Sequence, residues 1–163
     1  MGAVEYRYAS EAGRIAGELI PEHHRGLIGC RIEFVFRSKA TKTKGRVVLG
    51  SARKLTGLNA WLAGQMSEDS IVPEQFFVIE LAEDEWINLS ERQRRALVDH
   101  ELSHCDAYID DDGELKLSTR GHDLEEFTSI VERHGLWKGD VRRFVAVGAP
   151  QLDHESRGGA VDG

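Results

Sequence analysis

The chain has 163 residues, of which 40% are hydrophobic and 30% are charged. This composition predicts one globular domain with its own hydrophobic core over residues 1–147, followed by a disordered, polar tail over residues 148–163. The formal net charge of −7 argues against general binding to nucleic acid. No apolar run approaches the roughly 18 residues of a membrane span or resembles a signal peptide, so we expect a cytoplasmic protein.

The first half of the chain predicts one helix followed by strands. Residues 4–20 have apolar side chains at helical spacing, with Ser10 as the expected N-cap and Pro21 as the expected stop. Residues 31–37 and 45–50 have the composition of two strands separated by a polar turn, which predicts a hairpin. His23 and His24 lie between these elements and are expected in a solvated loop, since neighbouring residues point in different directions.

Residues 37–54 form a basic segment within an acidic chain, with seven lysines and arginines and no acidic residue. The segment has two interpretations, a contact surface for phosphates or an acidic partner and a solvated hairpin tip. It contains no aromatic residue on which a base could stack, so we do not expect it to bind nucleic acid directly.

Residues 51–72 have apolar side chains at helical spacing, but Gly57 and Gly64 weaken the pattern. The segment is interpreted either as a flap near a functional site or as a partly ordered connection. Residues 76–81 then form a short apolar run that is too brief for a helix, and they predict the strongest strand of the chain.

The pattern H-E-x-x-H occurs at residues 100–104, after a helix start signal formed by Ser90 and Gln93. On a helix, His100 and His104 lie one turn apart, about 6 Å along the axis, where both imidazoles can bind one metal ion. Glu101 points about 100° away from His100 and can reach a water on that ion. The pattern therefore predicts a hydrolytic zinc site.

The helix that carries this motif is expected to face the interior, because the two histidines share a stripe with apolar residues. The stripe consists of Ala96, Leu97, His100, His104, Ala107 and Tyr108. An alternative is that the histidines are satisfied core side chains. Several polar groups near a core are costly unless something organises them, which favours the metal site.

A catalytic zinc ion generally has three protein ligands, and the third is expected from residues 121–127. His122 is the preferred ligand, and Glu125 or Glu126 is the alternative. Asp123 and Glu126 have the spacing of a second capping box, so we expect His122 at the entrance of a helix that ends before Gly135.

These two segments resemble the SprT-like zinc metallopeptidases, in which H-E-x-x-H is followed by a G-H-x-x-E-F type segment with the third histidine. The fuller pattern, with residues 76–81, Trp86 and the helix at residues 89–105, is similar to the phage metallopeptidases, small relatives in phage and prophage genomes. The resemblance covers residues 31–137. Residues 123–125 depart from it by one added residue, so the glutamate alternative for the third ligand stays open.

The resemblance implies Zn²⁺ bound by His100, His104 and His122, with Glu101 as the general base of peptide hydrolysis. It implies an α+β zincin-like fold, with a mixed or antiparallel sheet of about three to four strands against the metal-binding helix. It also implies that the strand before that helix forms a sheet edge that binds an extended protein or peptide substrate by main-chain pairing. The residues of this expected substrate strand are Phe76, Phe77, Val78, Ile79 and Glu80.

Two other functions are consistent with the same residues. One is a zinc-stabilised binding or regulatory module that grips one protein partner and no longer cleaves; the other is a peptidase of narrow specificity that docks through the basic segment. Glu101 argues against the first, because a structural site has no need of a carboxylate beside an open coordination position.

Overall fold

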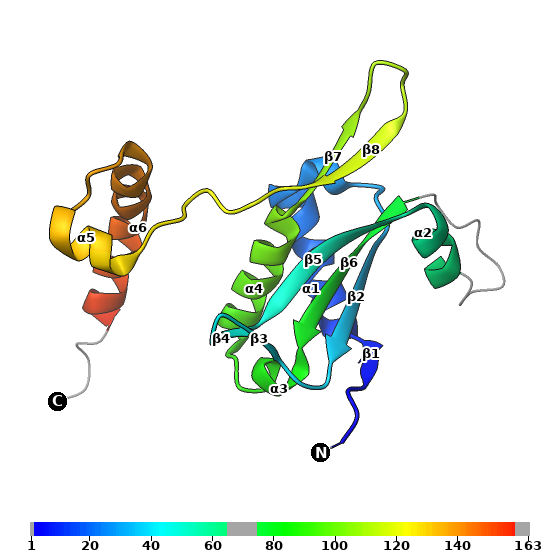
Figure 1. The fold of residues 1–163 in the computed structure, drawn as a ribbon, viewed down its shortest axis with the longest axis horizontal. Coiled ribbons are helices and arrows are strands. Elements are labelled where there is room, and N and C mark those ends of the chain that lie inside the picture. The colour runs from blue at the N-terminus through cyan, green and yellow to red at the C-terminus, as the bar shows by residue number, and fades with distance from the viewer. Residues whose placement is uncertain (1, 65–74, 159–163) are drawn as a thin grey trace. The chain divides into compact units, whose positions relative to one another are not determined.

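The computed structural model describes residues 2–64 and 75–158, with only the backbone described over 151–158. It divides into two compact units, Met1–Arg120 and Gly121–Gly163. The fold is α+β, as the sequence predicted, with a mixed four-stranded sheet, two small hairpins and six helices in the described part of the chain (Figure 1). None of the described helices has both the length and the apolar character needed to span a bilayer.

The sheet has the strand order β1-β2-β6-β5. Its strands are β1 (Tyr6–Tyr8), β2 (Ile32–Arg37), β5 (Gly50–Thr56) and β6 (Gln75–Ala82). β2 and β6 are parallel, and the other two pairs are antiparallel. β6 is therefore an inner strand, which explains its nearly continuous apolar sequence, since an inner strand covered by helices needs few polar side chains.

The predicted hairpin between residues 31–37 and 45–50 is wrong. β4 (Arg46–Val48) pairs instead with β3 (Thr41–Thr43), through a tight turn in which Lys44 and Gly45 both have positive φ, 51° and 77°. Such a turn closes a local hairpin of its own. The partners of β2 are β1 and β6, which are distant in sequence and which no local spacing could indicate.

Helix α1 (Ser10–His23) buries Ala12, Ile15, Ala16 and Leu19, as its apolar stripe predicted. Its ends differ from the prediction. Ser10 is the first helical residue rather than the cap, and the helix continues past Pro21, since a proline in the last turn removes only one backbone hydrogen bond. The residues before it form β1 rather than helix.

Residues 50–64 form the strand β5 and the short helix α2 (Gly57–Gly64), so helix begins only at Gly57. Residues 65–72 of the expected flap lie outside the described residues, and the flap stays a prediction. α2 carries exposed apolar side chains, including Trp61, which is 54% exposed.

After β6 the chain forms a single turn, α3 (Glu83–Trp86), and then α4 (Glu91–Ser103), which contains H-E-x-x-H. α4 packs beside α1, where Arg95 Nη1 lies 2.7 Å from Glu18 Oε2. The buried cluster draws most of its side chains from α1, β2, β6 and α4, and Trp86, Cys105 and Leu117 join it from α3, β7 and β8. Its members with no exposed surface are Ala12, Phe77, Ile79, Leu81, Val98 and Leu102.

α4 ends at Ser103, and the hairpin of β7 (Cys105–Ile109) and β8 (Leu115–Thr119) follows directly. The prediction that the helical stripe continues through Ala107 and Tyr108 is therefore wrong. β7 and β8 lead the chain away from the end of α4 and back to it.

The second unit contains α5 (Thr128–His134) and α6 (Gly139–Gly158). Gly135 follows α5 with φ 66°, which confirms the predicted end of that helix. The predicted capping box of Asp123 and Glu126 is wrong, because α5 begins later and its N-cap is Phe127. α6 continues to Gly158, past the point where we expected a frayed tail, while the domain boundary at residue 147 stays a prediction.

Candidate metal centre

The end of α4 places His100 and His104 on one face of the helix. The helix begins with the predicted capping box: Ser90 Oγ accepts from the Gln93 N–H at 3.2 Å, and Gln93 Oε1 accepts from the Ser90 N–H at 2.9 Å. Thirteen helical residues follow, and His104 is the C-cap with helical φ and ψ. The two imidazole centroids lie 5.0 Å apart with the rings nearly perpendicular.

The return of β8 fixes the orientation of the His104 ring. The Arg120 N–H donates to the His104 carbonyl at 2.8 Å, and His104 Nδ1 lies 2.6 Å from the Arg120 carbonyl oxygen. A carbonyl can only accept, so Nδ1 carries the proton and the lone pair of His104 is on Nε2. A backbone partner of this kind orients histidine ligands in metal sites.

His122 completes a group of three imidazoles. One ring nitrogen from each of His100, His104 and His122 lies within 4.8 Å of the others, a spacing at which they could hold one metal ion. Glu125 and Glu126 do not belong to this group among the residues described. Glu126 Oε1 instead accepts from the Phe127 N–H at 2.8 Å.

The inward orientation predicted for the histidines is wrong. His100 is exposed and His104 is partly exposed, whereas the buried face of α4 carries Val98, Glu101 and Leu102. The predicted stripe does not match the buried face even within the helix, since Ala96 is exposed and Leu97 is only partly buried. The imidazoles thus lie at the surface, where an ion and a substrate can reach them, and the carboxylate between them lies inside.

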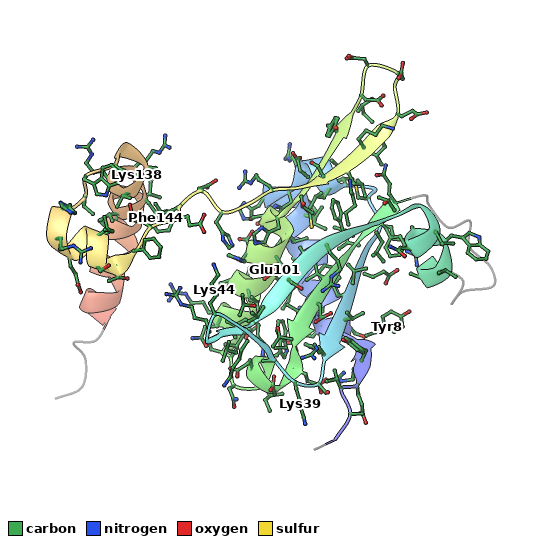
Figure 2. All side chains as sticks on the ribbon, in the orientation of Figure 1. Tyr8, Lys39, Lys44, Glu101, Lys138 and Phe144 are labelled. Atoms are coloured by element: carbon green, nitrogen blue, oxygen red, sulfur yellow. The ribbon has the colours of Figure 1, made fainter. Side chains whose placement is uncertain are left out.

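The carboxylate of Glu101 is buried, and one of its two oxygens has no hydrogen bond within the described part of the chain to offset the loss of contact with water. The side chain is 3% exposed, and its Oε2 has no hydrogen-bond partner among the described residues. Burial raises the pKa of Glu101 from 4.5 to about 7, and the nearby His104 opposes this shift. Figure 2 labels Glu101 between α4 and β5.

An unsatisfied carboxylate oxygen in the interior normally costs free energy, and such groups concentrate at functional sites. Three neutral imidazoles are suitable ligands for a divalent transition metal ion, and three protein ligands leave a coordination position open. A carboxylate with a pKa near 7 beside that position can accept a proton from water and give it up again. These donors and Glu101 together fit a bound divalent ion.

A further contact near this site was missed by the sequence analysis. His24 Nε2 lies 2.6 Å from Asp99 Oδ1, and the His24 side chain is only 12% exposed, so the expectation of a solvated loop is wrong for His24. The pair joins the end of α1 to the residue before His100. Neither residue belongs to a motif, so only the tertiary fold reveals the contact.

A pocket of about 340 Å³ lies beside the end of α4 and the Asp99–His24 contact. It is lined by Ser103 and Cys105, which flank His104, and by His23, His24, Arg25, Gly26, Leu27, Asp106 and Arg120. Burial raises the pKa of the Cys105 thiol to about 12, so this cysteine is an unreactive packing residue.

Comparison with protein families matches residues 4–147 to a family described as "Putative phage metallopeptidase". The chain belongs to this phage metallopeptidase family. Comparison with curated proteins found no match, and neither did comparison with solved structures. For a phage metallopeptidase, a surface group of three imidazoles with a buried carboxylate is a plausible metal centre for hydrolysis.

One expected part of the phage metallopeptidase site is incorrect. The strand expected to bind substrate at a sheet edge, residues 76–80, belongs to β6, which pairs on one side with β2 and on the other with β5. Its backbone groups are used within the sheet, and Phe76, Phe77 and Ile79 are buried. The edge strand nearest α4 is β5.

Proposed function

We propose that this chain is a zinc-dependent metallopeptidase of the SprT-like, zincin type, which hydrolyses peptide bonds of a protein or peptide substrate. The observation that carries the proposal is the buried Glu101 carboxylate, whose Oε2 has no partner among the described residues, next to three imidazoles that could hold one ion. Family membership and the H-E-x-x-H spacing support the same activity.

In this proposal His100, His104 and His122 hold Zn²⁺. Once bound, the ion would lower the pKa of a water molecule toward neutrality and polarise the carbonyl group of the scissile bond. His104 can bind through Nε2, because its Nδ1 proton is held by the Arg120 carbonyl. Neutral imidazole ligands leave the full charge of the ion available for this effect.

Glu101 would act as general base and then as general acid. Its carboxylate takes a proton from water as the water oxygen bonds to the carbonyl carbon, and it passes that proton to the amine nitrogen as the C–N bond breaks. Burial suits Glu101 to both steps, because a base with a pKa near 7 releases a proton almost as readily as it accepts one.

The substrate would be a protein or peptide of the host cell or the phage, met in the cytoplasm. An extended substrate would form main-chain hydrogen bonds with the exposed edge of β5 and not with β6, since β5 is an edge strand of the sheet and contacts α4. This assignment replaces the one expected from the sequence.

The decisive test separates the base from the ligands. Glu101→Gln should keep bound zinc and reduce the hydrolysis of casein and of broad fluorogenic peptides by about 100-fold or more, because the amide cannot accept the proton. His100→Ala should lose both zinc and activity. Glu91→Gln, on the exposed first turn of the same helix, is the matched control and should change neither.

Zinc content is measured by elemental analysis and hydrolysis by initial rates. Hydrolysis by Glu101→Gln at the rate of the unaltered protein would exclude Glu101 as the base. Zinc bound by the unaltered protein without any hydrolysis would instead favour a binding or regulatory module.

A further inference from the structure

Gly50 lies directly against the Glu101 carboxylate. It is the first residue of β5, it lies opposite Leu81 of β6, and it is half-buried. A Cβ atom at this position would lie 2.8 Å from Glu101 Oε1, 3.1 Å from Glu101 Cδ and 3.1 Å from Leu81 Cδ2. Real Cβ atoms essentially never approach another heavy atom as closely as 2.8 Å.

The backbone conformation does not explain why this residue is a glycine. Gly50 is not among the glycines with positive φ, so its φ and ψ are open to other residues. The space around it does explain the choice. Glu101 is 3% exposed and Leu81 has no exposed surface, so a methyl group at residue 50 would fit only if one of these two buried side chains were displaced.

The other glycines whose surroundings the structure describes lack this constraint. Gly17, on the exposed side of α1, has no atom within 4 Å of the Cβ position, so an alanine there meets nothing. Among the described glycines, only Gly50 would bring a Cβ within 3.0 Å of another atom. The close approach is therefore specific to the strand that faces Glu101.

We propose that Gly50 is a positioning residue for Glu101. By lacking a side chain, it leaves the space in which the carboxylate lies between α4 and β5, and it thereby sets where the carboxylate stands relative to His100 and His104. The inference rests on the proposed function for its catalytic consequence. Its geometric content, the location of the Glu101 carboxylate, does not depend on activity.

The first test is Gly50→Ala compared with Gly17→Ala. In Gly50→Ala the methyl group should displace the carboxylate, so kcat for peptide hydrolysis should fall by about 10- to 100-fold, the size of effect expected from misplacing a reacting group by about 1 Å. The zinc Kd should stay within about twofold, because the imidazoles are not touched. KM should also stay within about twofold, because main-chain pairing with β5 uses backbone groups that the substitution leaves in place. Gly17→Ala should change none of these values.

A second measurement does not depend on catalysis. A crystal structure of metal-free Gly50→Ala should show the Glu101 carboxylate moved from its position beside β5, with His100 and His104 in place. An unmoved carboxylate would overturn the inference. If the unaltered protein proves inactive, this structure still tests the role of Gly50, while the inactivity counts only against the proposed function.

A third variant covers the case in which Gly50→Ala folds poorly. Glu101→Ala removes the carboxylate that the new methyl group would meet, so adding Gly50→Ala should lower the melting temperature less in the Glu101→Ala protein than in the unaltered one. An equal loss in both backgrounds would show that Leu81 or the strand itself, and not Glu101, limits residue 50. Unchanged kcat in a well-folded Gly50→Ala protein would also overturn the inference.

Discussion

The Glu101 side chain places an ionisable group in the interior of the protein, which makes the stability of the metal-free form depend on pH. Its pKa is about 7 in the folded protein and near 4.5 when exposed. Below about pH 4.5 Glu101 is protonated in both the folded and the unfolded protein, so its burial does not reduce the free energy of unfolding. Between about pH 4.5 and pH 7, Glu101 loses its proton in the unfolded protein but keeps it in the folded protein. The free energy of unfolding therefore falls as pH rises, and the loss is complete above about pH 7.

Glu101→Gln should therefore stabilise the metal-free protein at pH 8 by about 3 kcal/mol, since the amide stays neutral at every pH. The gain should shrink to near zero at about pH 4.5. The measurement is urea unfolding in the presence of a chelator at several pH values, with Glu91→Gln as the exposed control. A gain that is equal at all pH values would show that the buried charge is not its source.

The third ligand can be identified by single substitutions. His122→Ala should weaken zinc binding by about 100-fold or more, because two remaining imidazoles make a poor site for the ion. Glu125→Gln and Glu126→Gln should leave the affinity within about twofold. Competition with a chromogenic chelator gives the three affinities. Loss of zinc in either glutamine variant, with retention in His122→Ala, would restore the alternative considered from the sequence.

The sequence could indicate that His100 and His104 lie close together, because a helical motif is local. His100 and His104 need only a helix to come together, and the start of that helix was marked by Ser90 and Gln93. The sequence did not predict that Glu101, and not the histidines, faces the core. That depends on where α4 ends and on what packs against it. The contacts of Gly50 and His24 are tertiary and leave no local signal.

At the scale of single elements, α4 depends on its cap. Ser90→Ala removes the hydrogen bond to the Gln93 N–H and should lower the free energy of unfolding by about 1 kcal/mol. The change in the urea midpoint, at constant slope, measures the loss. Ser129→Ala in α5 is the control, because Ser129 is exposed in a helix whose cap it does not form. A loss of similar size in both variants would argue against a specific capping role.

The strands were predicted more reliably than their partners. Residues 76–81 were recognised from composition, yet their place inside the sheet was not, because pairing with β2 and β5 joins segments far apart in the sequence. The strand at residues 45–50 was likewise predicted to pair with residues 31–37, whereas β4 pairs with β3. Their turn at Lys44 and Gly45 is a local feature that could have indicated the correct pairing.

At the scale of the whole molecule, the chain divides after Arg120, whereas composition suggested one domain to residue 147. Every member of the buried core cluster lies between Ala9 and Leu117. A chain that ends at Arg120 should therefore fold cooperatively on its own, although it lacks His122. A chain that ends at Phe127 should fold equally well and also bind zinc.

Circular dichroism during thermal unfolding and zinc titration of the two shortened chains provide the comparison. Failure of the chain ending at Arg120 to fold would support the single domain of residues 1–147. If the two shortened chains bind zinc with equal affinity, His122 is not a zinc ligand.

His104 is the single residue between α4 and β7, so the change from helix to hairpin takes place at this residue. His104 also makes two contacts with the backbone of Arg120, the residue after β8, one through its own carbonyl oxygen and one through Nδ1 of its ring. Any tilt of the β7–β8 arm must therefore rotate this imidazole, and fixing the imidazole must restrain the arm. Metal binding at the proposed site should therefore also reduce the motion of the β7–β8 arm.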